Sequence, residues 1–326
     1  MQKIPYTTIN GGSVPMMILS VFSMITFTSV YGFDSVWTEW WWTYDGFSGP
    51  AWWGTKWPIC TMGRYQSPID ILPDKLLFDP NLTGVVFSSE KKINGNLTNT
   101  GNDITLFVDD VIVPLINATS GPLQYVYHLH HIKLHFGHDE ASGSEHTVNG
   151  QAFPAEIQLY MFNADLYANY TQAMSSPNGL VAVSIFLEVG KIGNEAYTMI
   201  SNALTHIPTK GQQHRVHGLP LSVLLPQTKE YITYEGSLTQ PQCQETVTWV
   251  IFNKPIYITE QQLTQLRNVN KEGGSHLLIF GNIRPSQPMY NRLVRTNINF
   301  RPKTKVCSMV KEVFYEVNTV QTRSGR

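Results

Sequence analysis

The chain has 326 residues, a formal net charge of −1 at pH 7 and a charged fraction of 14%. This length is ample for one large domain with a full hydrophobic core. The near-neutral charge without a basic stripe argues against a nucleic-acid-binding protein. The aromatic content of 12% is typical of a globular chain rather than a disordered one.

The N-terminal region contains an apolar run over residues 14–30, with Lys3 upstream and Gly32 just after it. This arrangement is typical of a secretory signal peptide, so we predict that residues 1–32 are removed on export. The alternative is an uncleaved membrane anchor, which takes ~20 apolar residues. No second apolar run of that length follows, which predicts a secreted, extracellular mature chain without a transmembrane segment.

Asn-x-Ser/Thr sequons agree with export. N-glycosylation needs this tripeptide, a secreted chain and an accessible surface. Four sequons occur, and we expect a glycoprotein whose candidate acceptors are Asn81, Asn96, Asn117 and Asn169.

Residues 33–59 are unusually rich in Trp and Gly, in the stretch WTEWWWTYDGFSGPAWWGTKWP. So many large aromatics this close together cannot all be core. One interpretation is aromatic packing under a long irregular segment. The alternative is an exposed binding patch, because exposed apolar patches mark interaction sites.

Many short runs with alternating or β-branched residues follow, separated by Gly, Asn and Pro. They predict strands over residues 104–108, 132–136, 155–162, 181–190, 246–252 and 255–259. Helices are expected to be few and short, over residues 195–204 and 259–268, the second with Thr259 as a candidate N-cap. The pattern predicts a mainly β (α+β) fold with one large, mostly antiparallel twisted sheet and short peripheral helices.

The segment YHLHHIKLHFGHDEASGSEHTVNGQAFPAEIQLYMFN, residues 127–163, resembles the signature of the α-carbonic anhydrases. In that family a strand carries His-x-His before an aromatic residue and Gly, a GSEHTV turn follows, and the next strand carries a third His. The three positions that bind zinc in the family correspond here to Lys133, His135 and Gln158. The resemblance extends over residues 37–301 and implies the α-carbonic anhydrase fold for a domain of residues 33–301.

Two of these three residues are poor zinc ligands. Catalytic zinc commonly takes three protein ligands and leaves a fourth position for water. A Lys ammonium has three donors and no lone pair, so Lys133 would place a positive charge beside a dication. The amide oxygen of Gln158 suits hard cations better than zinc. We therefore predict no bound metal, no cofactor and no carbonic anhydrase activity.

Other parts of the family's site are present by resemblance. Glu145 corresponds to the buried glutamate that orients a hydroxyl beside the zinc, Thr239 to that hydroxyl residue, and Tyr44 to a tyrosine of the same network. Asn102 stands where active members often carry a His proton shuttle, and Asn does not titrate near neutral pH. For Glu145 we also expect a buried ion pair with Lys133. Removing one partner of such a pair is strongly destabilising, because it leaves the other charge buried and uncompensated.

A relocated zinc site that still supports hydratase chemistry is the alternative. It would use His128 with His130, which have i, i+2 spacing, or His135 with His131, which lie ~13 Å apart on one strand face. His130 is expected on the apolar face with Ile132. The other histidines form no short ligand motif and are expected as ordinary loop or surface residues: His138, His146, His206, His214, His217 and His276.

A third function, a structural matrix component, would rest on Ca²⁺ binding by the acidic pair Asp109 and Asp110. Two adjacent acids in a strand-turn are also typical of a solvated turn. Without acidic repeats in the sequence, little supports this interpretation.

Three cysteines are present. In an oxidising compartment an odd count indicates one intramolecular disulfide and one leftover thiol. By resemblance to extracellular members of the family, the bond joins Cys60 to Cys243. Cys307 lies in a C-terminal tail of residues 302–326, where we expect a covalent link to a partner, either another protein or a second copy.

Within the family, the stretches SPNGLVAVSIF, GSEHTVNGQAF, RTNINF and NKPIYIT are most similar to the secreted carbonic anhydrase-related proteins X and XI. That group carries a basic residue and Gln at the same two positions, with Arg usual where Lys133 stands. The resemblance implies an acatalytic, secreted protein of the synapse that binds cell-surface receptors of the neurexin type, including through disulfide linkage. It implies a protein partner rather than nucleic acid.

Overall fold

The structure is a computed structural model that describes residues 42–88, 92–109, 116–139, 141–269 and 281–299. Apart from Trp42, these residues belong to one compact unit that begins at Thr43. The predicted signal peptide, Asp110, His276 and the tail with Cys307 lie outside the described residues. Among those residues, no helix has the length and apolarity needed to cross a membrane.

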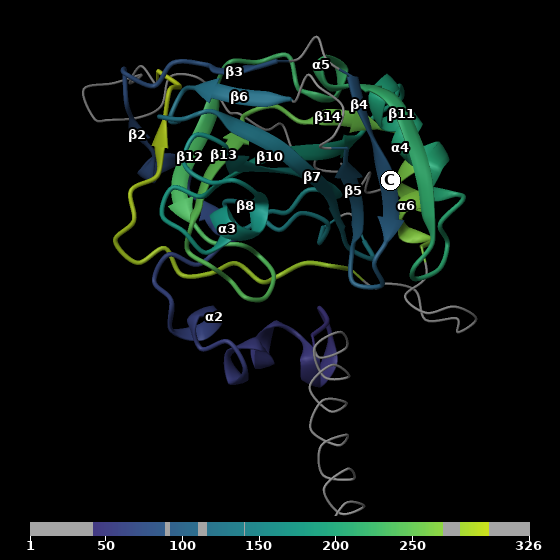
Figure 1. Cartoon of the computed structure of the whole chain (residues 1–326), viewed down its shortest axis with the longest axis horizontal. Coiled ribbons are helices and arrows are strands. Elements are labelled where there is room, and N and C mark those ends of the chain that lie inside the picture. Colours follow the sequence, from purple (N-terminus) through teal and green to yellow (C-terminus); the bar gives the residue numbers. More distant parts are fainter. Residues whose placement is uncertain (1–41, 89–91, 110–115, 140, 270–280, 300–326) are drawn as a thin grey trace, which may run out of the picture. The chain divides into compact units, whose positions relative to one another are not determined.

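A sheet of 13 strands dominates the fold (Figure 1), with its main path in the order β11-β4-β5-β7-β9-β10-β13-β12-β15-β2. Most neighbours are antiparallel, and β10–β13, β10–β14 and β15–β2 are parallel. The strands of the sheet are β2 (Leu77–Phe78), β3 (Val85–Phe87), β4 (Lys92–Asn99), β5 (Ile104–Val108), β6 (Asn117–Ser120), β7 (Tyr127–Phe136), β9 (Ala155–Asn163), β10 (Leu180–Val189), β11 (Gln213–Pro220), β12 (Tyr231–Gly236), β13 (Val247–Phe252), β14 (Ile256–Ile258) and β15 (Arg295–Thr296).

Short helices and one small sheet surround it. Strands β1 (Asp70–Ile71) and β8 (Thr147–Val148) pair in parallel. The helices are η1 (Gly46–Ser48), η2 (Pro50–Thr55), α2 (Ile59–Met62), η3 (Pro73–Lys75), α3 (Tyr170–Met174), α4 (Glu195–Leu204), α5 (Leu221–Leu224) and α6 (Glu260–Arg267). The mainly β prediction is confirmed, as are both predicted helices. Thr259 caps α6 in a capping box with Gln262, which satisfies two backbone donors.

The two faces of the sheet carry different residues because side chains alternate along a strand. On β7 and β9, Ile132, Leu134, Ile157 and Leu159 face a large apolar core that also takes in residues of α4, α5 and α6. In Figure 1, α4 accordingly lies beside β11, and α6 packs against α4. Tyr160 faces the second, smaller core on the other side of the sheet. The polar residues that alternate with the first set therefore gather on this second face.

Candidate functional site

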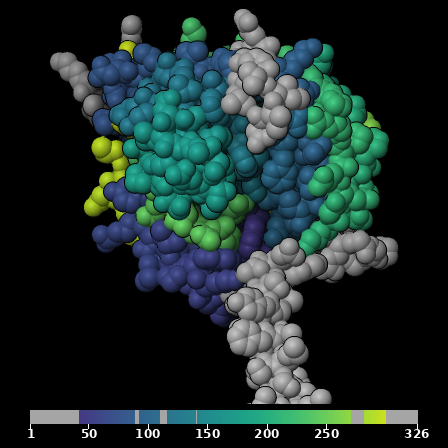
Figure 2. All heavy atoms as spheres, viewed as in Figure 1, coloured from purple at the N-terminus to yellow at the C-terminus, as the bar shows by residue number. Residues whose placement is uncertain are grey.

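The positions predicted by resemblance meet on neighbouring strands. In the antiparallel register of β7 and β9, Lys133 pairs with Gln158 and His135 with Glu156. All four side chains are buried, and they share the face of the sheet on which Tyr160 lies. In Figure 2 the surface is hollowed between the teal residues of the middle of the chain and the blue residues of its earlier strands.

Lys133 is held by an acid other than the one expected. Its ammonium forms an ion pair with the carboxylate of Asp103, and it also donates to Gln240 Oε1 at 2.6 Å. The predicted pair of Lys133 with Glu145 is therefore wrong. The reason is register, because Thr105 of β5 lies opposite Lys133 and brings Asp103, two residues earlier, within reach.

The surroundings of Asp103 stabilise its ionised carboxylate. Thr100 and Thr105 donate hydroxyl hydrogen bonds to its Oδ1 at 2.8 and 2.7 Å. Burial alone would raise the pKa of this carboxyl, but the charge and hydrogen bond of Lys133 and the two hydroxyls outweigh it and lower the pKa to about 2. Lys133 and Asp103 thus form a charged, buried pair with its remaining acceptors satisfied, as such pairs require.

Gln158 is fixed by three hydrogen bonds. Its Nε2 donates to Glu145 Oε2 and to Glu156 Oε1, both at 2.9 Å. Its Oε1 accepts from the hydroxyl of Tyr160 at 2.7 Å. The amide oxygen, the only atom of this side chain with metal-binding capacity, is thereby committed to Tyr160.

His135 is the one imidazole at the three positions. Its Nδ1 lies 2.7 Å from the carbonyl oxygen of Asn282, and because a carbonyl only accepts, Nδ1 carries the proton. Its Nε2 lies 3.6 Å from Glu145 Oε2 and has no hydrogen-bond partner among the described residues. The ring is fully buried and oriented, so His135 presents a single nitrogen to the site.

Glu156 anchors the network beneath these residues. It accepts from the backbone amides of Glu145 and His146, from His146 Nδ1 and from Ser184. Burial would raise the pKa of this carboxyl, but His146 lowers it to about 2. His146 lies in a loop, as expected, but it is not at the surface, because its ring is fully buried and its Nε2 lies 2.8 Å from the hydroxyl of Tyr234.

The other residues named by resemblance lie around this network. The Tyr44 ring lies edge-on to His135, with the ring centroids 6.5 Å apart. Burial, followed by the charges of Glu145 and Asp103, raises the pKa of Tyr44. Thr239 is buried and acts to lower the pKa of Tyr160, which burial raises well above its usual range.

Asn102 is half-buried and directly precedes Asp103, and its backbone amide lies 3.3 Å from Thr100 Oγ1. The structure thus places the predicted shuttle position beside the acid that pairs with Lys133.

The alternative metal ligands contact other side chains or one another. His128 Nδ1 lies 2.5 Å from Asn117 Oδ1, and the β7–β9 register shifts between Leu129 and His131. That bulge brings His130 Nδ1 within 2.8 Å of His131 Nδ1, so the expectation that His130 lies on the apolar face is wrong. Burial, followed by the charge of Lys133, holds the pKa of His131 well below its usual range.

Asp109, the first of the two acids considered for Ca²⁺, accepts from both Nη atoms of Arg215. Its carboxylate is thus taken by a guanidinium. The part of the chain that the structure describes contains no group of three His, Cys, Asp or Glu side chains placed to hold a metal ion.

The donor set at the predicted zinc positions does not fit zinc. The ammonium of Lys133 lies in an ion pair, the amide oxygen of Gln158 accepts from Tyr160, and His135 supplies one nitrogen. One imidazole falls short of the three protein ligands that a catalytic zinc takes.

Cys60 and Cys243 form the disulfide that the resemblance implied, with their Cα atoms 5.2 Å apart. Arg284 lies beneath it, a residue that the sequence did not single out. This buried guanidinium donates to the carbonyl oxygens of Ser67 (2.7 Å) and Cys60 (2.8 Å) and faces the ring of Trp53. It ties the N-terminal segment to the site, because its own backbone amide donates to Glu145 Oε1 at 3.0 Å.

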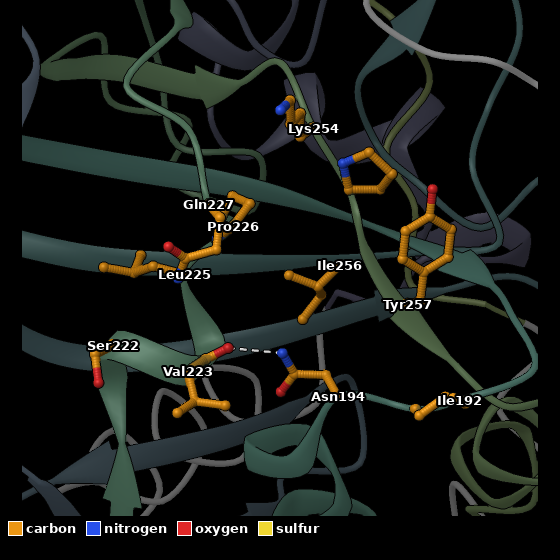
Figure 3. A pocket seen from close by; sticks show the side chains of 12 residues that line it. Ile192, Asn194, Ser222, Val223, Leu225, Pro226, Gln227, Lys254, Ile256 and Tyr257 are labelled. Carbon is orange, nitrogen blue, oxygen red and sulfur yellow. Dashed lines mark hydrogen bonds between the residues drawn. The ribbon is translucent and has the colours of Figure 1, made fainter.

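A separate pocket of about 520 Å³ opens between α5 and the start of β14 (Figure 3). Its side chains are mainly apolar, with Tyr257 and Lys254 among its lining, and Asn194 donates to the carbonyl oxygen of Val223 at 2.6 Å. None of the residues of the predicted zinc positions lines this pocket.

Comparisons with known proteins agree with the fold. The profile of the eukaryotic-type carbonic anhydrase family matches residues 48–298. A curated protein of Caenorhabditis elegans named "Putative carbonic anhydrase-like protein 2" is 42% identical over 300 residues, which cover 87% of this chain and 87% of the relative. On its sequence and its sheet, this chain belongs to the eukaryotic-type carbonic anhydrase family.

Proposed function

We propose that this member of the family is a secreted, glycosylated protein without carbonic anhydrase activity that acts by binding another extracellular or cell-surface protein. One observation carries the loss of catalysis. By resemblance, Lys133 stands at the position of the first zinc ligand, and in the structure its ammonium is paired with the carboxylate of Asp103. An ammonium cannot donate a lone pair, and without zinc the family's route to hydroxide at neutral pH is missing.

The binding role rests on the resemblance to carbonic anhydrase-related proteins X and XI, and a receptor of the neurexin type is the candidate partner. The apolar run at residues 14–30 and the four sequons support secretion. Cys307 is the candidate for a covalent link, because the bond between Cys60 and Cys243 leaves it as the odd thiol.

The test has two arms. Purified protein should show no CO₂ hydration above the uncatalysed rate, and it should bind the ectodomain of a neurexin-type receptor. Non-reducing electrophoresis of the mixture should show a shifted band that Cys307→Ser removes. A zinc-dependent hydration rate would overturn the proposal that the protein lacks carbonic anhydrase activity. Failure to bind the ectodomain would overturn the proposal that the partner is a receptor of the neurexin type.

A further inference from the structure

Two segments far apart in the sequence form one exposed surface. The first segment contains Met62, which is the last residue of α2, and Arg64 and Tyr65, which follow the helix. The second segment precedes β15 and contains Tyr290 and Leu293. The Arg64 guanidinium lies 5.7 Å from the centre of the Tyr290 ring, which joins the segments. The exposed fractions are 73% for Met62, 50% for Tyr65, 55% for Tyr290 and 68% for Leu293. We call these five residues the Tyr290 surface.

The backbone under this surface is firmly held. Arg284 and the Cys60–Cys243 disulfide anchor the first segment, and the amide of Tyr65 donates to Glu245 Oε1 at 2.7 Å. Tyr290 has a φ of +47°, a conformation that bulky residues rarely adopt. Its ring nevertheless remains half exposed, so the fold holds an aromatic side chain outward on a strained turn instead of burying it.

The charges of the surface favour an acidic group on whatever covers it. Arg64 is exposed and forms no ion pair with any residue that the structure describes. Burial lowers the pKa of Arg292, while Tyr234 and then Glu245, Tyr65 and Tyr290 act to raise it, so this second guanidinium lies within electrostatic range of Tyr65 and Tyr290. Glu245 already accepts from Tyr65 and from Gln66 Nε2.

The mixture of Tyr, Met and Arg is the composition of protein–protein interfaces and of their hot spots. We propose that the Tyr290 surface is the docking face for the protein partner, which covers Tyr290 and Leu293 with apolar side chains and presents a carboxylate to Arg64. This rests on the proposed binding function. Cys307 lies 14 residues after Leu293, a stretch of chain that spans at most ~50 Å, so a thiol there can reach a partner docked on this surface.

The test measures saturable binding of the full secreted chain, fluorescently labelled, to cells that display neurexin-type receptors. Tyr290→Ala with Leu293→Ala should weaken binding at least about tenfold, as loss of hot-spot side chains does. Arg64→Glu should weaken binding more than Arg64→Lys. The matched control is Tyr257→Ala with Ile192→Ala at the pocket of Figure 3, whose exposed fractions are 51% and 84%. This control should leave binding within about twofold of the unmodified chain.

Each other outcome has a distinct meaning. If the unmodified chain binds and the Tyr290 and Leu293 variant binds equally well, the docking face is wrong while the binding function stands. If only the control variant loses binding, the partner docks at the pocket of Figure 3. If binding survives protease treatment of the cells, the ligand is not a protein, and the docking proposal fails. If the unmodified chain does not bind at all, the proposed receptor class fails and the docking face falls with it. Unchanged thermal unfolding of every variant would exclude misfolding.

Discussion

Lys133 and Gln158 lie directly opposite each other on β7 and β9, yet their side chains join different acids. Lys133 pairs with Asp103, which directly precedes β5, while Gln158 donates to Glu145 and Glu156. Two positions that would share a metal in an active relative are thus drawn into two separate polar networks. Each network can be tested by itself.

Replacing Lys133 by Met should destabilise the protein strongly. The substitution leaves the buried Asp103 carboxylate without its cation. Removing one partner of a buried ion pair lowers the free energy of unfolding by about 3–5 kcal/mol. The free energy of unfolding, measured by urea denaturation at neutral pH, should fall by that amount.

The double variant Lys133→Met with Asp103→Asn provides the control, because it removes both charges together. It should be more stable than the single Lys133→Met variant, so the two substitutions should not be additive. Additive losses would mean that Lys133 and Asp103 contribute to stability independently and that their ion pair adds little.

The free energy of unfolding should fall at acidic pH, because Asp103 becomes protonated and its ion pair with Lys133 is lost. Lys133 and the two threonine hydroxyls outweigh burial and lower its pKa from 3.8 to about 2. Because the folded pKa lies below the unfolded one, this contribution to stability is complete above about pH 4 and is lost as the pH falls toward 2. Its size is roughly 2 kcal/mol.

Asp103→Asn should therefore flatten the fall in unfolding free energy between about pH 4 and pH 2. Asp74→Asn, at an exposed position in η3, is the matched control and should leave the slope unchanged. An equal slope in the protein and in the Asp103→Asn variant would contradict this prediction.

Zinc binding should appear when imidazoles are supplied at both altered positions. His135 already presents Nε2 because Asn282 holds its Nδ1, and Glu156 Oε1 lies 2.9 Å from the atom of Gln158 that a ring nitrogen would replace. Orientation of this kind by neighbouring acceptors is what zinc histidines need. The triple variant Lys133→His, Gln158→His and Asp103→Asn, which leaves no unpaired carboxylate at position 103, should bind zinc stoichiometrically by calorimetry.

Either single His substitution is the informative control for that variant. Each supplies only two imidazoles and should bind zinc far more weakly. If the triple variant folds but takes up no zinc, then the geometry of the site, and not only its ligands, has diverged from the family's.

Loss of the disulfide should lower stability by about 2–5 kcal/mol. Cys60 and Cys243 are 183 residues apart, so their bond restricts a long stretch of the unfolded chain. The double variant Cys60→Ser with Cys243→Ser should have a lower midpoint of thermal unfolding than the unmodified protein. Dithiothreitol should lower the midpoint of the unmodified protein but not that of the variant. A similar response of both to the reductant would assign the effect to another thiol.

Glycan occupancy should follow exposure. Asn81 and Asn169 are exposed, whereas Asn96 and Asn117 are half-buried on β4 and β6, with their Oδ1 atoms near Arg215 and His128. Because an acceptor must lie on an accessible surface, Asn81→Gln and Asn169→Gln should each remove one glycan by mass spectrometry. Asn96→Gln and Asn117→Gln should leave the mass of attached sugar unchanged, and a loss there would contradict the prediction.

The family resemblance named the residues of the site, and the alternation of residues predicted which of them share a face of their strand. Period-two patterning placed Lys133 and His135 on one face and Ile132 and Leu134 on the other, because the side-chain repeat of a strand leaves no choice. The short helix that Thr259 caps could also be predicted from the sequence, because helix capping is a local interaction.

The partners across the sheet could not be predicted in this way. Asp103 is 30 residues from Lys133, and only the register of β5 and β7 brings them together. The bulge at His130 depends on backbone pairing, which no pattern of residue types revealed. An acid directly before the predicted strand at residues 104–108 was the one available signal for Asp103.

The zinc content of the unmodified protein tests the central claim most directly. Protein purified in the presence of zinc, freed of excess metal and measured by elemental mass spectrometry alongside a CO₂ hydration assay should carry only a trace of zinc and hydrate no faster than buffer. Stoichiometric zinc that a chelator removes together with a hydration rate would contradict the claim that Lys133 and Gln158 have closed the site to metal.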